Sequence, residues 1–130
     1  MEAVFLFCAD AQAGLDGKLD IHGVFNELHA PDFPARQDQM VLVGIVEWQR
    51  DLQGRIPFTV DLTDSDGKAI FSIEGHTEVD ARPASKAPAK THFILPLKNV
   101  MFPAPGCYRV RIRINDSELA GPSMHLMQSQ

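Results

Sequence analysis

The chain has 130 residues, of which 45% are hydrophobic and 22% are charged, and its formal net charge at pH 7 is -5. This length and composition suit one soluble globular domain that buries its own core. The negative charge argues against general binding to nucleic acids or anionic membranes, because neutralising phosphates needs clustered Lys and Arg side chains. A local basic patch is still compatible with these totals.

Eight segments have the patterns of β-strands, and no segment has a convincing helical period. The first is a short apolar run, and the second alternates until Gly23 interrupts it. A glycine inside a strand often marks a bulge, so we expect the buried face to shift there. The eight segments are 3–8, 19–25, 40–48, 57–63, 69–79, 91–100, 108–114 and 119–127.

The third segment, 40–48, is almost continuously apolar, which predicts a central strand covered on both faces. Two long loops interrupt the series of strands. Pro31 and Pro34 oppose regular structure across the first loop, 26–39. The second loop, 80–90, is rich in proline and alanine and has no apolar period.

The seventh segment, 108–114, has a strict alternation of apolar and basic residues. Because successive side chains of a strand point to opposite faces, the pattern predicts one buried apolar face and one cationic face. We expect the core to be organised around this strand. The apolar side consists of Tyr108, Val110, Ile112 and Ile114, and the basic side of Arg109, Arg111 and Arg113.

Together the segments predict an all-β fold: a single-domain antiparallel β-sandwich over residues 1–130, Ig-like or C2-like, with about 7–8 strands. Antiparallel neighbours sort the connections onto two ends. One end is expected to carry 26–39, 64–68 and 99–106, and the other 10–18, 49–56, 80–91 and 115–118. Functional residues of sandwiches usually lie on such loops.

Cys8 and Cys107 both lie in or beside apolar strand patterns. We expect two free, buried thiols in a reducing cytoplasm, and a disulfide between the first and seventh strands is the alternative. The apolar run after Met1 is short and lacks a positively charged flank, and no stretch has the length that spans a bilayer. The expectation is a mature cytoplasmic protein without a membrane partner.

The residues that carry most enzyme chemistry do not occur in known spacings. No two of the five histidines form HxH or HExxH, neither cysteine is in CxxC, and no serine is in GxSxG. We therefore expect no enzyme activity, no cofactor and no resident metal. Residues 64–67 resemble the start of a calcium loop, but Gly75 stands where that loop needs a bidentate Glu. A hairpin turn explains them, and the calcium alternative adds Asp32 from the same loop end.

The arginine row, consisting of Arg109, Arg111 and Arg113, places basic side chains about 6.6–6.8 Å apart along one face. In the functional interpretation, the row binds an anion or an acidic partner. In the structural interpretation, which we favour, it pairs with carboxylates across neighbouring strands, since opposite charges there stabilise a sheet. The candidate carboxylates are Asp61, Glu74 and Glu78.

Phe33, Met101 and Phe102 are apolar residues in proline-rich loops of the same predicted end. The structural interpretation is that they close the open end of the sandwich core. The functional interpretation is that they form a protein-binding patch. With the arginine row, they complete the candidate interaction surface.

Several motifs, in their order along the chain, resemble a group of small uncharacterised bacterial proteins, the DUF6941 type. The resemblance implies a bacterial cytoplasmic β-sandwich with no assigned activity. Its motifs are turns and strand starts, so they are specific for a fold and bring no catalytic residues. They are Cys8-Ala9-Asp10, residues 16–23, Phe33-Pro34, Asp66-Gly67-Lys68 and residues 102–108.

The first functional hypothesis is a non-enzymatic protein-interaction or assembly module with an unknown protein partner. Self-association as a homodimer through a sheet edge or face is part of it. The alternative is a ligand-binding module for calcium or a carbohydrate on the loop end 26–39, 64–68 and 99–106. A hydrolase with a site assembled from dispersed residues is the third, and it requires a nucleophile in contact with a base.

Overall fold

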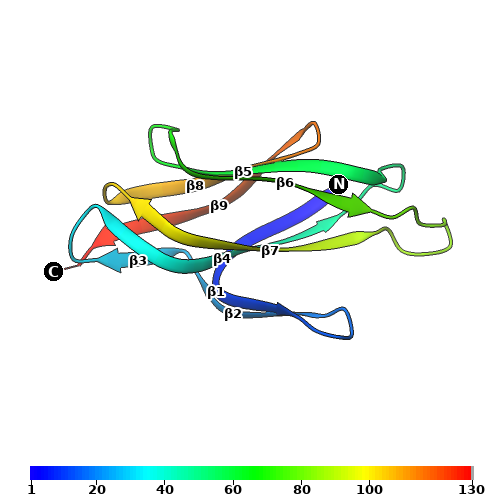
Figure 1. Ribbon diagram of the computed structural model, residues 1–130, viewed down its shortest axis with the longest axis horizontal. Coiled ribbons are helices and arrows are strands. Elements are labelled where there is room, and N and C mark those ends of the chain that lie inside the picture. Colours follow the sequence, from blue (N-terminus) through cyan, green and yellow to red (C-terminus); the bar gives the residue numbers. More distant parts are fainter. Residues whose placement is uncertain (130) are drawn as a thin grey trace.

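A computed structural model describes residues 1–129 as two packed β-sheets (Figure 1), and this range contains no helix. One sheet has four strands in the order β2-β1-β4-β7, and the other has five in the order β3-β9-β8-β5-β6. The all-β sandwich predicted from the sequence is confirmed. The strands are β1 (Glu2–Ala13), β2 (Leu19–Phe25), β3 (Glu27–Ala30), β4 (Ala35–Glu47), β5 (Gly54–Thr63), β6 (Ala69–Val79), β7 (Lys90–Phe102), β8 (Gly106–Ile114) and β9 (Ser117–Gln128).

The additional strand is β3, which lies within the segment 26–39 that the sequence pattern assigns to a loop. It runs parallel to β9, with Glu27 opposite His125. A strand of four residues carries little pattern of its own, and its partner is far along the chain, so no local signal identifies it. The turn expected at 10–18 is also shorter, because β1 continues to Ala13.

The main core lies between the two sheets, and β8 is the central strand of the five-stranded sheet. The inner side chains of β8 are buried, and the arginine row is exposed on the outer face. This confirms the alternation predicted for 108–114. Burying each large apolar side chain contributes about 1.5–3 kcal/mol, so β8 supplies a substantial part of the stability.

Strand β4 is buried on both faces over residues 40–46, as its apolar run predicts. Met40 and Leu42 belong to the main core, whereas Val41 and Val43 belong to a second, smaller cluster that includes Ala11 of β1. The hairpin of β1 and β2 covers this second cluster. Beyond Cys8, β1 no longer pairs with β4, and in Figure 1 this part of the hairpin diverges from β4 and runs beneath β4 and β7.

Gly23 marks the point at which β2 changes from one core to the other. Phe25 packs against the main core, whereas Leu19 and Ile21 pack against the second cluster. The β1–β2 register is the same on both sides of Gly23, so no residue is inserted and the expected bulge is absent. The change of core coincides instead with a φ of 70° at Gly23, a conformation that glycine adopts without steric penalty.

Gly44 in β4 makes room for an aromatic ring of the neighbouring strand. Phe5 of β1 is directly opposite Gly44, and a Cβ atom at position 44 would overlap its ring. The centroid of the Phe5 ring is 6.4 Å from that of Phe93. The absence of a side chain at position 44 is therefore a packing requirement of the main core.

Gly44→Ala is expected to lower the free energy of unfolding by about 1–3 kcal/mol, the usual cost of overpacking a core. Because the clash is with Phe5, Phe5→Leu is expected to lower the free energy of unfolding less in the Gly44→Ala background than in the wild type. Urea unfolding followed by the fluorescence of Trp48, which is buried, measures both costs. Equal costs in the two backgrounds contradict a direct contact between ring and glycine.

Candidate functional site

The arginine row lies in the middle of the outer face of the five-stranded sheet, because β8 is its central strand. All three arginines are exposed. The strands on either side offer few carboxylates in direct opposition. The residues across from Arg109, Arg111 and Arg113 are Thr63, Asp61 and Thr59 on β5, and Ser123, Ala120 and Glu118 on β9.

The ion pairs favoured for the arginine row are not among those formed within residues 1–129. Asp61 is directly across from Arg111, but its carboxylate accepts a hydrogen bond of 2.6 Å from the Ser72 hydroxyl. Glu74 and Glu78 lie on β6, one strand farther from β8. For Glu74 and Glu78 the reason is the order of the strands in the sheet, which the sequence pattern does not provide; for Asp61 it is the hydrogen bond with Ser72.

A groove of about 380 Å³ lies beside the arginine row, between β8 and β9. The pairing register of these strands shifts between Arg109 and Arg111, which forms a β-bulge. The guanidinium group of Arg111 donates a hydrogen bond of 3.4 Å to the carbonyl oxygen of Gly67. Both arginines border the groove, which also has apolar walls. Its apolar lining residues are Val110, Leu119 and Ala120.

The three apolar candidates of the interaction surface do not form one exposed patch. Phe102 is 1% exposed, and its ring meets that of Tyr108 edge-on with centroids 4.9 Å apart. Phe33 is partly buried against the main core, and only Met101 is largely exposed, at 46%. Phe102 is therefore a core residue and is not available to a partner. The positions of Phe102 and Phe33 agree with the structural interpretation, in which these residues close the open end of the sandwich core.

The connections 31–34, 64–68 and 103–105 meet at one end of the sandwich, on the left in Figure 1. A small pocket of about 110 Å³ lies between 64–66 and 103–108. The Asp64 carboxylate accepts hydrogen bonds from the backbone N–H groups of Asp66 and Lys68, at 3.0 and 2.9 Å. This carboxylate closes the hairpin turn. Residues 1–129 contain no group of three or more His, Cys, Asp or Glu placed to hold a metal ion.

Tyr108 ties the connection between β7 and β8 to the core. Its hydroxyl donates a hydrogen bond of 2.6 Å to the carbonyl oxygen of Ala104 and accepts one of 3.3 Å from the Ala104 N–H. The ring itself is 2% exposed. The loop at this end is therefore held by a buried side chain of β8 through both backbone groups of one residue.

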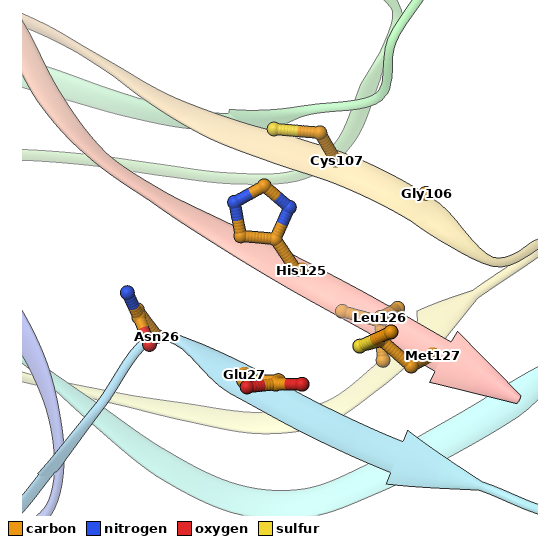
Figure 2. A pocket seen from close by; sticks show the side chains of 7 residues that line it. All are labelled: Asn26, Glu27, Gly106, Cys107, His125, Leu126 and Met127. Carbon is orange, nitrogen blue, oxygen red and sulfur yellow. The ribbon is translucent and has the colours of Figure 1, made fainter. Parts of the chain in front are cut away.

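A thiol and an imidazole lie next to each other on β8 and β9 (Figure 2). The alternation along β8 places them on the outer face that also carries the arginine row. Cys107 of β8 is directly opposite His125 of β9, and Glu27 of β3 is opposite His125 on its other side. All three border a pocket of about 420 Å³. The hydrogen bonds of residues 1–129 include none between the thiol and the imidazole. This pair therefore does not form a nucleophile–base contact.

Sequence reasoning did not single out Cys107 and His125 as a pair. No short motif contains both residues, and a regular hairpin places a different residue opposite Cys107. Counted from the pair Ile114–Ser117, an unbroken ladder aligns Cys107 with Met124. The bulge between Arg109 and Arg111 moves the register by one residue and brings His125 into position. No pattern in either strand indicates that shift by itself.

The two cysteines are free and lie in different sheets. Cys8 is fully buried, and burial raises the pKa of its thiol. Cys107 is only partly buried, which differs from the expectation that both thiols are buried. The alternative of a disulfide between the first strand and the strand at 108–114 is not realised in the structure.

Comparison with known families finds one described as a family of unknown function (DUF6941), whose model matches residues 3–127. No curated protein matches the chain. The match covers nearly the whole chain and agrees with the resemblance noted from its motifs. No helix within residues 1–129 has the length and apolar character needed to cross a lipid bilayer.

Tyr108→Phe keeps the buried ring and removes the hydroxyl that holds Ala104. We expect the free energy of unfolding to fall by about 0.5–1.5 kcal/mol, the net contribution of a typical hydrogen bond. Hydrogen exchange of the Ala104 amide is expected to become faster at the same time. Unchanged stability together with unchanged exchange contradicts the anchoring role of Tyr108.

The two thiols are expected to react with iodoacetamide at very different rates. Alkylation of Cys8 should be slower than that of Cys107 by about a thousandfold or more, because exposing Cys8 requires opening a core with a stability on the order of 5 kcal/mol. Mass spectrometry of peptides from timed reactions measures both rates in one sample. The difference should disappear in urea above the unfolding midpoint, and similar rates in buffer contradict the burial of Cys8.

Proposed function

We propose that this chain, which belongs to the family of unknown function DUF6941, is a non-enzymatic protein-interaction module that binds an acidic partner on the outer face of its five-stranded sheet. The observation that carries the proposal is the arginine row: three exposed guanidinium groups on a central strand, outside the ion pairs of residues 1–129. The bacterial cytoplasmic setting, the Ig-like relationship and the self-association expected from the sequence belong to the same proposal.

The spacing of the arginine row favours an extended partner segment. Side chains on one face of a strand recur every two residues, about 6.6–6.8 Å apart, in the protein and in an extended peptide alike. An acidic residue at every second position of such a peptide therefore meets each guanidinium group in turn. Arginine suits this role because its planar group binds a carboxylate through two parallel hydrogen bonds.

The rest of the charge distribution makes this attraction local. The formal net charge of the chain is -5, so the protein as a whole repels polyanions while the arginine row attracts a short acidic segment. The groove beside Arg109 and Arg111 also offers apolar contact with the partly exposed Leu119 and the exposed Ala120. A partner segment that alternates acidic residues with small or apolar ones fits both features.

The test uses a short fluorescent peptide that alternates Glu and Thr, and measures its binding by fluorescence anisotropy at low salt. Replacing Arg109, Arg111 and Arg113 together with Ser is expected to weaken binding by about tenfold to a hundredfold, from three exposed charge contacts of about 0.5–1 kcal/mol each. A peptide of equal composition with its Glu residues in one block is expected to bind more weakly than the alternating peptide.

The matched control replaces Arg36, Arg50 and Arg82 with Ser, which changes the net charge equally at other places on the chain. This control should bind the alternating peptide almost as well as the wild type. If both triple variants lose binding equally, net charge and not the arginine row is responsible. Trp48 fluorescence verifies that each variant is folded, because this residue is buried in the main core.

A further inference from the structure

The pocket of Figure 2 gathers soft metal-binding groups on the outer face of the five-stranded sheet. Cys107 and His125 are directly paired across β8 and β9. Directly opposed residues of antiparallel strands have Cβ atoms about 4.5–5.5 Å apart, which is within the span that two side chains bracket around one metal ion. Met127 follows two residues after His125, on the same outer face of β9, and borders the same pocket.

The donor atoms of this pair have few competing contacts. The Cys107 thiol has a weak contact of 4.0 Å with the carbonyl oxygen of Tyr108. Within residues 1–129, the His125 ring takes part in no hydrogen bond or ion pair, whereas the nearby His29 ring lies 3.2 Å from the Glu27 carboxylate. A metal ion at the pair therefore does not have to displace an existing strong contact.

The ligand types select the metal. Structural zinc sites use four Cys, His or carboxylate ligands, and residues 1–129 contain no group of even three such residues arranged for a metal. Thiolate sulfur binds both copper(I) and zinc, whereas thioether sulfur binds copper(I) and is not among the usual ligands of zinc sites. A thiolate, an imidazole and a thioether together match copper(I) better than they match zinc or calcium.

We propose that Cys107 and His125, with Met127 as a third ligand, form a binding site for one copper(I) ion. The thiol of Cys107 loses its proton to the solvent when the Cu–S bond forms, and the copper remains in the +1 state, so the step needs no oxidant or reductant. The ring of His125 coordinates through a neutral nitrogen, and the thioether of Met127 turns toward the ion. This proposal is independent of the acidic-partner function, since the arginine row supplies none of the ligands.

The test is an anaerobic competition for Cu(I) against a coloured Cu(I) chelator, followed by absorbance. The wild type is expected to withdraw one equivalent of Cu(I), and Cys107→Ser is expected to withdraw none. We expect His125→Asn to weaken Cu(I) binding by about tenfold or more. Even residues that only hydrogen-bond to a metal ligand commonly change the metal affinity by about tenfold to a hundredfold. Met127→Leu is expected to weaken binding to a smaller extent.

The chain provides matched controls for the two weaker ligands. Met101 is 46% exposed and Met127 45%, so Met101→Leu removes an equally accessible thioether away from the site. His22→Asn removes an exposed imidazole of β2 in the same way. Neither control is expected to change the affinity for Cu(I). Blocking Cys107 of the wild type with iodoacetamide repeats the test without a substitution, in case Cys107→Ser fails to fold.

The proposal is overturned if His125→Asn and Met127→Leu bind Cu(I) as tightly as the wild type. That result means that an accessible thiol alone captures the ion. It is also overturned if the alkylated wild type still withdraws one equivalent, or if Zn(II) displaces Cu(I) from the site in a parallel titration.

Discussion

The alternation of side chains along β8 is the constraint on which the other features of this protein depend. Its inner residues are buried between the two sheets, where they form the centre of the main core. Because successive side chains of a strand point to opposite faces, burying Tyr108 and Val110 forces Cys107 and Arg109 outward. A slip of one residue would bury the guanidinium groups and expose the core, so this register is strongly specified. The arginine row and the thiol are both consequences of that single packing requirement.

The bulge between β8 and β9 decides which residues accompany them on the outer face. Beyond the bulge, Met124 is completely buried and His125 is exposed. Gly121 lies against Val110 at this point, where a Cβ atom would come within 2.7 Å of the valine. Pro122 follows, and a proline without a backbone N–H is tolerated at a bulge because the ladder is already interrupted there. One inserted residue in β9 thus places the imidazole of His125 opposite Cys107, where an unbroken ladder would place the thioether of Met124.

The two sheets use their outer faces differently. The four-stranded sheet carries Val41 and Val43 on its outer face, and the β1–β2 hairpin covers them with a second cluster. The five-stranded sheet has no such cover and presents polar side chains, including the arginine row, to solvent. This asymmetry directs both proposals to the same sheet. An uncovered polar face can meet a partner or an ion without exposing the core.

Whether a candidate residue could be placed from the sequence depends on whether its surroundings are local or distant along the chain. The exposure of the arginine row could be predicted because the alternation that causes it lies within one strand. Phe102 belongs to a loop-like sequence, yet it is buried, because β7 continues to that residue and packs it against Tyr108. The ion pairs with Glu74 and Glu78 depend on which strand lies beside β8. That neighbour is β5, and β6 lies beyond it.

The sequence by itself determined the class of the fold, the strands with a clear period of two, and the face of β8 that is buried. These properties follow from local patterns, since the transfer of apolar side chains from water sets the direction of each strand face. Only the tertiary structure decided the strand order, the parallel pairing of β3 with β9, and the meeting of Cys107 with His125. Those depend on which segments, distant along the chain, bury their apolar faces against each other, and on a single bulge that no local period records.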